Sequence, residues 1–420
     1  MKLSLHRMAI SMQLSFSLCS LMTFLLLSLT ENPLLADSKT LESDIQVLRS
    51  IRQSINPHTI TSSSFLHSWN FAVDPCDAPG PHFLGILCDI PDNNSSSRIT
   101  AINLQADGLE GFLPPGLGNL TELTLLNLGK NKFHGPIPDS IVNMRKITRL
   151  LLSDNSLSGS IPHGFRGLKR LEIIDLSHNR LSGSIPAAIS SIRSLIHLRL
   201  SSNKISGRIP DLTGLWQLNT LDLSSNQLVG NIPEFPNSLI TLSLRDNLLS
   251  GHISSLNGLR HLRALDLSHN RFSGPINQAI FALPEIRNVN VSANLFTRID
   301  VMRMSTRRRP SQLRAIEAQS NRISGRLPIN LITYQNLNSV NLGHNLFHGR
   351  IPVEYGERVS KGFWRSLFLD YNMLQGNVPS GFSHGSSKGS LAHNCLNCRR
   401  GIPMCRGRQR SPTDCVKALW

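Results

Sequence analysis

An asparagine that recurs at a nearly constant interval constrains this chain more than any other feature. It lies in a repeated pattern of the form L-x-L-x-x-N-x-L-x-G-x-I-P, seen for example over residues 173–186. A unit of this length cannot bury its apolar side chains alone, so consecutive units must stack on one another. The recurring slot contains Asn131, Asn155, Asn179, Asn203, Asn226, Asn247, Asn270, Asn294, Asn321, Asn345 and Asn372, and Asp107 fills it in an earlier unit.

Elementary geometry explains this pattern. Alternate residues of a short strand point to the same side, so Leu126 and Leu128 face inward. An inward-facing asparagine amide can both donate to and accept from the backbone of adjacent coils. The Gly183–Pro186 segment allows a tight turn and then an extended run that cannot continue as helix. The sequence therefore predicts an α/β leucine-rich repeat solenoid of about twelve units, with a parallel sheet on its concave side and little helix on its convex side.

The ends of the chain differ from the repeats. Lys2 and Arg7 precede an apolar stretch that is densest over residues 21–29, which indicates a signal peptide, with cleavage near Ala36. An uncleaved N-terminal anchor is the alternative, and no later stretch resembles a membrane span. Open solenoid ends need polar caps. We expect a signal peptide over 1–36, an N-terminal cap over 37–98 that begins with an amphipathic helix, a solenoid over 99–382 and a C-terminal cap over 383–420.

Six cysteines remain after the signal segment, and they cluster at the two ends of the chain. An even number in an oxidising compartment predicts three disulfides, which would fasten the caps. The Cys395-x-x-Cys398 pair could instead be a zinc half-site or a redox motif, but its spacing and its Gly/Ser-rich setting favour neither. Three pairings remain open for the last four cysteines. The six are Cys76, Cys88, Cys395, Cys398, Cys405 and Cys415.

The formal net charge of +16 favours polyanionic surroundings, and secretion makes nucleic acid an unfavoured partner. No nucleotide-binding loop, nucleophile elbow, zinc-protease or kinase motif is present, so we expect no enzyme, no metal site and no cofactor. The histidines His178, His269 and His344 recur just before the repeat asparagine, which indicates a solvated position set by register.

Candidate binding residues lie beside the inward leucines, where strand positions face solvent. The basic residues Arg149, His197, Arg199 and Arg245 could form an anion-attracting band on the concave face; a generic wetted strand surface is the alternative. Exposed aromatic residues are enriched at interfaces, so Phe368 and Tyr371 could anchor a partner, or they could pack under the C-terminal cap.

Irregular units and glycosylation sequons add further candidates. The run Arg307, Arg308 and Arg309 interrupts one repeat and fits a solvated loop, an electrostatic tether to acidic wall polysaccharide, or a processing site. Asn119 is the best acceptor for N-glycosylation because it lies off the concave strands, whereas a glycan on Asn290 would block part of the concave face. The sequons occur at Asn93, Asn94, Asn119 and Asn290.

The motif N-x-L-S-G-x-I-P resembles the plant-specific class of extracellular leucine-rich repeats. The segment from Trp69-Asn70 through Asp74-Pro75-Cys76 to Cys88 resembles the N-terminal cap of plant receptor-like kinases, receptor-like proteins and polygalacturonase inhibitors, with Phe83 where that family often has Trp. The resemblance covers residues 40–420. It implies a secreted, non-catalytic protein in the cell wall or at the outer face of the plasma membrane. Its expected partner is a peptide, a receptor-kinase ectodomain, or both; inhibition of a wall-degrading hydrolase such as polygalacturonase is the alternative.

Overall fold

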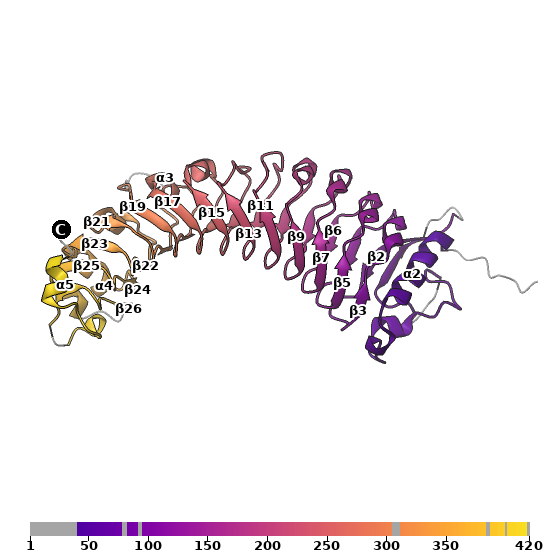
Figure 1. Ribbon diagram of the computed structural model, residues 1–420, viewed down its shortest axis with the longest axis horizontal. Helices are drawn as coiled ribbons and strands as arrows, with labels where there is room; N and C mark the ends of the chain where they lie inside the picture. The colour runs from indigo at the N-terminus through magenta and orange to yellow at the C-terminus, as the bar shows by residue number, and fades with distance from the viewer. Residues whose placement is uncertain are drawn as a thin grey trace, which may run out of the picture.

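Stacked coils form an elongated arc in the computed structural model of the chain (Figure 1). The structure describes residues 40–77, 82–90, 95–304, 311–383, 387–399 and 401–417. The expected signal peptide, two of the sequons (Asn93 and Asn94) and the run Arg307–Arg309 lie outside these residues. No helix in the described ranges is long and apolar enough to cross a membrane.

Each coil contributes a single strand to one sheet that runs the length of the arc, and the last strands of this sheet lie toward the inner edge of the arc (Figure 1). Its strands are parallel, except that β1 pairs antiparallel with β2 at the N-terminal end. In sheet order they are β1 (Ile86–Asp89), β2 (Arg98–Asn103), β4 (Leu125–Asn127), β6 (Arg149–Leu151), β8 (Ile173–Asp175), β10 (His197–Arg199), β12 (Thr220–Asp222), β14 (Thr241–Ser243), β16 (Ala264–Asp266), β18 (Asn288–Asn290), β20 (Ala315–Glu317), β22 (Ser339–Asn341), β24 (Ser366–Phe368) and β26 (Lys388–Ser390).

A second layer of short strands follows each repeat asparagine and covers one flank of the arc. Gly183 ends such a strand with φ of 77°, a backbone conformation that side chains disfavour, and the chain then turns toward the convex side. These strands are β3 (Glu110–Phe112), β5 (Lys132–Pro136), β7 (Ser156–Ser160), β9 (Arg180–Gly183), β11 (Lys204–Gly207), β13 (Gln227–Gly230), β15 (Leu248–Gly251), β17 (Arg271–Ile276), β19 (Leu295–Ile299), β21 (Ser324–Gly325), β23 (Leu346–Gly349), β25 (Met373–Asn377) and β27 (Cys395–Asn397).

Short helical turns occupy the convex side, as the G-x-I-P pattern predicts. Most are single 3-10 turns that begin after the repeat proline. They are η3 (Pro115–Asn119), η4 (Asp139–Asn143), η5 (His163–Gly167), η6 (Ala187–Ser191), η7 (Ser254–Gly258), α3 (Gln278–Phe281), η8 (Ile329–Thr333), α4 (Val353–Ser360) and η9 (Ser380–Ser383). The caps contain α2 (Glu42–Ser54), η1 (Pro57–Thr59) and η2 (Phe65–Ser68) at one end, and η10 (Pro403–Cys405) and α5 (Pro412–Lys417) at the other.

The repeat asparagines form a continuous hydrogen-bonded ladder inside the solenoid. Asn155 is representative: its Nδ2 donates to the Leu128 carbonyl of the preceding coil at 3.0 Å, and its Oδ1 accepts from the Phe133 amide of that coil at 2.9 Å. Nδ2 also donates to carbonyls of its own turn, so one side chain satisfies several inward-facing backbone groups. This confirms the predicted fold and gives the repeat asparagine its physical role.

The ladder continues beyond residue 382, into the segment that we assigned to the C-terminal cap. Asn394 is fully buried and repeats the same pattern, with Nδ2 donating to the Leu369 carbonyl and Oδ1 accepting from the Leu374 amide. Gln409 then takes the place of a further rung. Its Oε1 accepts from the Leu396 amide at 3.4 Å and its Nε2 donates to the Leu391 carbonyl at 3.0 Å.

Both caps cover apolar core with aromatic and disulfide-linked segments. Phe83 is buried, with its ring centroid 5.9 Å from that of Trp69 and 5.3 Å from that of Phe71, so it fills the space where related caps often have Trp. Disulfides join Cys76 to Cys88, Cys395 to Cys415 and Cys398 to Cys405. The end staples predicted from the sequence are confirmed, and the structure selects one of the three possible C-terminal pairings.

Candidate functional site

The concave sheet presents two solvent-facing residues from most strands. In β10, for example, Leu198 is fully buried, whereas His197 and Arg199 on either side of it are partly exposed. Equivalent residues of successive strands lie in register, so they form rows along the arc. This surface is the principal candidate binding site, because it is long, uncovered and varied in side-chain chemistry.

The four predicted basic residues do not form a continuous row on this surface. Arg199 lies between Asp175 and Asp222 on its two neighbouring strands, and its Nη1 is 3.9 Å from Asp175 Oδ2. Each of these aspartates also accepts hydrogen bonds from the serine two residues further on. Arg149 lies on β6 in register with the apolar residues Leu125 and Ile173, and Arg245 lies just after β14, so the three arginines occupy different places along their strands.

His197 occupies a poorly hydrated position within that part of the sheet. Its Nδ1 is buried and has no hydrogen-bond partner among the described residues. Burial lowers the pKa of His197, and the nearby Arg199 guanidinium lowers it further. The imidazole is therefore biased toward its neutral form, which weakens it as an anion ligand.

The two predicted aromatic residues have different surroundings. Phe368 is half-buried at the end of β24. Tyr371 is 40% exposed, and its ring stacks between the rings of His344 and His393, with centroids 4.1 Å apart on each side. All three ring-bearing residues in this stack have positive φ, near 53°. Tyr371 is therefore part of an exposed aromatic row at the edge of the concave sheet.

Four arginines just before the concave strands form a feature that our sequence reasoning missed. Each lies directly before the first residue of a strand: Arg263 before β16, Arg287 before β18, Arg314 before β20 and Arg365 before β24. We call this set the arginine ladder. A sequence signal existed, since an arginine stands two residues before the inward apolar residue in each of these repeats, but we considered only the positions that directly flank the leucines.

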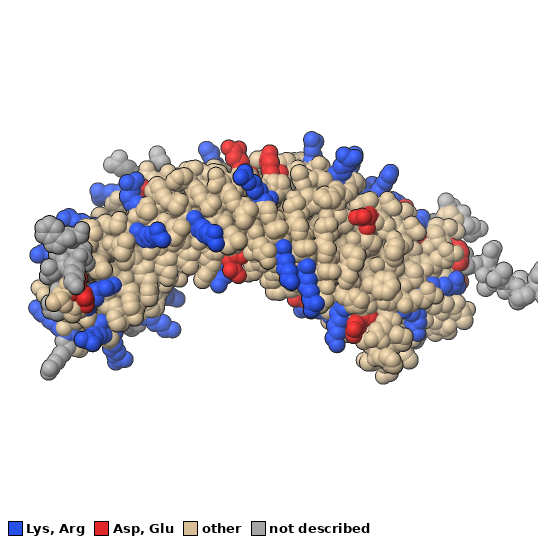
Figure 2. All heavy atoms as spheres, viewed as in Figure 1, with Lys and Arg blue, Asp and Glu red and all other residues tan. Residues whose placement is uncertain are grey.

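The flank covered by the second layer of strands is also basic. Figure 2 shows more Lys and Arg than Asp and Glu side chains on the face that it displays. The residue directly after the repeat asparagine is an exposed cation in several coils, and none of these cations forms a salt bridge with a described residue. This group comprises Lys132, Arg180, Lys204, Arg271 and Arg322.

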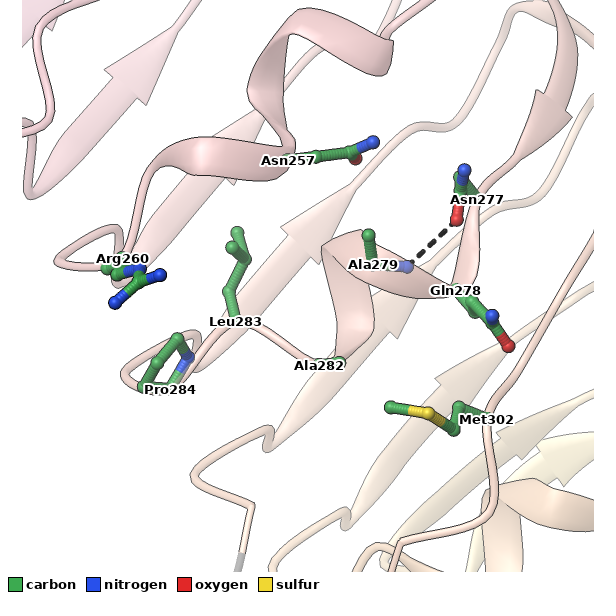
Figure 3. A pocket seen from close by; sticks show the side chains of 9 residues that line it. All are labelled: Asn257, Arg260, Asn277, Gln278, Ala279, Ala282, Leu283, Pro284 and Met302. Atoms are coloured by element: carbon green, nitrogen blue, oxygen red, sulfur yellow. Dashed lines mark hydrogen bonds between the residues drawn. The ribbon is translucent and has the colours of Figure 1, made fainter.

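A shallow cleft of about 400 Å³ lies on the convex side, between the turns that carry η7 and α3 (Figure 3). The Asn277 side chain caps α3 by accepting from the Ala279 amide, and Arg260 and Met302 lie toward opposite ends of the cleft. Arg260 is the one ionisable residue among those lining it. The cleft has room for a small ligand but offers no acid–base pair.

The two described sequons lie in different environments. Asn119 is exposed at the end of η3, on the convex side. Asn290 lies on β18 in register with Asp266, and its Oδ1 accepts from the Ser292 amide and hydroxyl as that aspartate does from Ser268. Asn290 thus has a structural hydrogen-bonding role in the sheet. No group of three His, Cys, Asp or Glu residues in the described ranges could hold a metal ion.

These features define a capped leucine-rich repeat solenoid with an open concave face. Family models support the assignment along the chain. A leucine rich repeat N-terminal domain matches residues 41–89, a leucine rich repeat model matches 149–205, and a two-copy leucine rich repeat model matches 193–237. No match was found among curated protein sequences.

Several solved structures are similar to this chain. The ectodomain of the Arabidopsis thaliana receptor kinase GASSHO1/SCHENGEN3, in complex with CASPARIAN STRIP INTEGRITY FACTOR 2, is 27% identical with a TM-score of 0.59 over 72% of this chain and 40% of that one. A plant ice-binding protein is 26% identical with a TM-score of 0.52 over 87% of this chain and 98% of that one. The PEPR1–AtPEP1 structure, at 24% identity and a TM-score of 0.53, covers 88% of this chain and 62% of that one and shows the shared fold.

The chain is a leucine-rich repeat protein that is similar to plant extracellular leucine-rich repeat proteins. Its fold is similar to that of a plant receptor-kinase ectodomain, and its disulfides fit an extracellular protein. The match spans 40% of the length of the GASSHO1/SCHENGEN3 ectodomain.

Proposed function

We propose that this protein is a non-catalytic recognition protein of the plant cell wall or outer plasma-membrane face, and that it binds a peptide, a receptor-kinase ectodomain, or both in signalling or defence. The uncovered concave sheet is the observation that carries this proposal. Its strand residues face solvent in registered rows, so an extended ligand can contact many coils at once. Similarity to an ectodomain solved with a bound factor supports the same choice.

Capture of purified receptor-kinase ectodomains and their peptides by the secreted, glycosylated protein tests the proposal. Thr241→Trp places a bulky side chain on an outward position of β14, whereas Gln217→Trp places the same side chain on an exposed site off the sheet. We expect Thr241→Trp to abolish capture and Gln217→Trp to retain it. Equal capture by both variants would contradict a concave binding site.

The charge-reversed variant Arg149→Glu/Arg199→Glu/Arg245→Glu tests the predicted basic residues within that face. If these arginines contact an anionic partner, the triple variant should lose capture that wild type retains. Because Asp175 and Asp222 lie beside Arg199, the matched variant Asp175→Asn/Asp222→Asn should strengthen the same contact. Unchanged capture by both variants would exclude this part of the sheet.

Inhibition of a secreted wall-degrading hydrolase such as polygalacturonase is a second candidate function. The exposed cations of the second-layer flank, which form no salt bridge with any described residue, favour it, since they suit an acidic enzyme surface or an acidic polysaccharide such as pectin. Dose-dependent loss of hydrolase activity on polygalacturonan, relieved by Arg180→Gln/Lys204→Gln, is the expected result. Full activity at saturating protein would exclude this function.

A further inference from the structure

The arginine ladder is held in register by main-chain hydrogen bonds between coils. The Arg287 amide donates to the Arg263 carbonyl at 2.9 Å, and the Arg314 amide donates to the Arg287 carbonyl at 2.7 Å. Asn338 then links the next coil, and the Arg365 amide donates to its carbonyl at 2.8 Å. Neighbouring strands in a sheet lie about 4.8 Å apart, so Arg263, Arg287 and Arg314 precede adjacent strands along one edge of the concave sheet. Arg365 stands two strands beyond Arg314 on the same edge.

Most of this ladder lacks an internal counter-ion. Arg263 pairs with Glu285, its Nε lying 2.8 Å from Oε2. Arg314 and Arg365 are exposed and form no salt bridge with any residue that the structure describes. The Nε of Arg287 is buried with no hydrogen-bond partner in the same part of the chain. Among the described residues, Glu285 is the one acid that forms a salt bridge with a ladder arginine, so most of the ladder's positive charge is available to a ligand.

Further along β20 and β24, the last residue of the strand is acidic or aromatic and no longer basic. Glu317 stands three residues after Arg314 on β20, about 10 Å along an extended strand, and Phe368 stands at the equivalent place after Arg365. Glu317 is half-buried and is hydrogen-bonded to Ser339. A uniformly anionic polymer in this groove would bring its charge against Glu317. An extended peptide alternates its side chains between two sides and can present acids to one row and bases or aromatics to the other.

We propose that the arginine ladder binds the carboxylates of an extended peptide whose alternate basic or aromatic side chains face Glu317 and Phe368. The inference rests on the proposed recognition function and specifies its ligand chemistry. Guanidinium groups suit this task because they bind carboxylates in a bidentate geometry. The protein's overall positive charge would attract any anion. The ladder, together with Glu317 and Phe368, would instead select peptides by the order of their acidic and basic or aromatic residues.

Synthetic peptides of zero net charge test this inference directly. One probe alternates aspartate and lysine, and its control places the same residues in an acidic block followed by a basic block. Fluorescence anisotropy with the full secreted protein should show tighter binding of the alternating probe, since only that sequence separates its charges onto two sides. Preference for the block peptide, or equal affinity for both, would overturn the proposal.

Matched variants locate the contact. Arg314→Gln/Arg365→Gln removes two exposed ladder residues, and Arg180→Gln/Lys204→Gln removes the same charge from the second-layer flank. We expect about a tenfold loss of affinity, or about 1.4 kcal/mol, from the first pair and no change from the second. Glu317→Gln should also weaken the alternating probe.

The outcomes separate this inference from the proposed function. An equal loss of affinity in Arg314→Gln/Arg365→Gln and in Arg180→Gln/Lys204→Gln would show non-specific charge attraction and overturn the proposal. Capture of an ectodomain partner that Thr241→Trp abolishes but Arg314→Gln/Arg365→Gln leaves intact would overturn the ladder's role and leave the recognition function standing. Binding of oligogalacturonate in preference to the alternating peptide, lost in the ladder variant, would replace the peptide with a polyanionic sugar ligand.

Discussion

Removing one asparagine from the interior ladder should destabilise the solenoid far more than removing an exposed asparagine. The side chain of Asn247 is buried, and its Oδ1 accepts from the amide of the fully buried Leu228 at 3.0 Å. Its Nδ2 donates to the Leu223 carbonyl of the preceding coil at 3.0 Å and to two carbonyls of its own turn. Asn247→Ala leaves all of these groups without their side-chain partner.

The expected loss follows from the number of groups left unsatisfied. A buried donor or acceptor without a partner costs about 1–3 kcal/mol, so loss of the Leu228 and Leu223 contacts predicts a fall of about 2–6 kcal/mol in the free energy of unfolding. Asn247→Asp should cost a similar amount, because a carboxylate can accept from Leu228 but cannot donate to carbonyls. Asn288→Ala, at an exposed position of β18, is the control and should change stability by less than about 0.5 kcal/mol.

Urea unfolding followed by tryptophan fluorescence measures these differences, and hydrogen exchange localises them. The amide of Leu228 should lose protection in Asn247→Ala, because its acceptor is removed, whereas amides of distant coils should keep theirs. A stability of Asn247→Ala equal to that of Asn288→Ala would refute the assignment of the ladder as a main source of cohesion between coils.

Three further predictions follow from particular side chains. Burial depresses the pKa of His197 in the folded state, so the unfolded chain binds more protons below about pH 6.5 and stability should fall on acidification. Urea unfolding at neutral and acidic pH should show a smaller fall in stability for His197→Gln than for wild type. An identical fall in both proteins would contradict the burial argument. Glycopeptide mass spectrometry should find a glycan on the exposed Asn119 and none on Asn290, whose side chain accepts hydrogen bonds from Ser292 within the sheet. Replacing both Cys395 and Cys415 with alanine removes a disulfide that joins residues 20 positions apart, and should lower the stability of the C-terminal cap by about 2–4 kcal/mol in thermal unfolding. An unchanged melting temperature would indicate that Gln409 and the core hold the cap without this disulfide.

The repeat pattern made most of the fold predictable, because each inward leucine and each ladder asparagine serves the same purpose in every coil. The coil of Asn394 was harder to find, since Gly389 stands where the first inward leucine is expected and Cys398 stands where the repeat glycine is expected. Gln409 escaped detection because a longer side chain from an irregular segment performs the rung's function. Nothing in the spacing of the last four cysteines distinguishes their pairings, which depend on how the cap folds back.

The candidate site was less predictable because binding surfaces depend on neighbours from different repeats. Arg199 looks like part of a basic band in the sequence, but registered strands bring Asp175 and Asp222 to both of its sides. The ring stack around Tyr371 likewise joins residues from three coils. The arginine ladder required a comparison of the position before each strand, where no structural rule demands arginine and where its recurrence is therefore informative.

The asparagine ladder has a direction, and this has a consequence for how the protein is made. Each rung reaches back to the coil before it, so a newly synthesised coil completes the hydrogen bonds of one that has already emerged from the ribosome. The first slot holds Asp107, whose carboxylate accepts from the Ser64 hydroxyl and the Phe65 amide, because no earlier repeat offers carbonyls to a donor. Biosynthesis from the N-terminus therefore matches the order in which the coils can satisfy one another, and a stalled chain leaves only its newest turn incomplete.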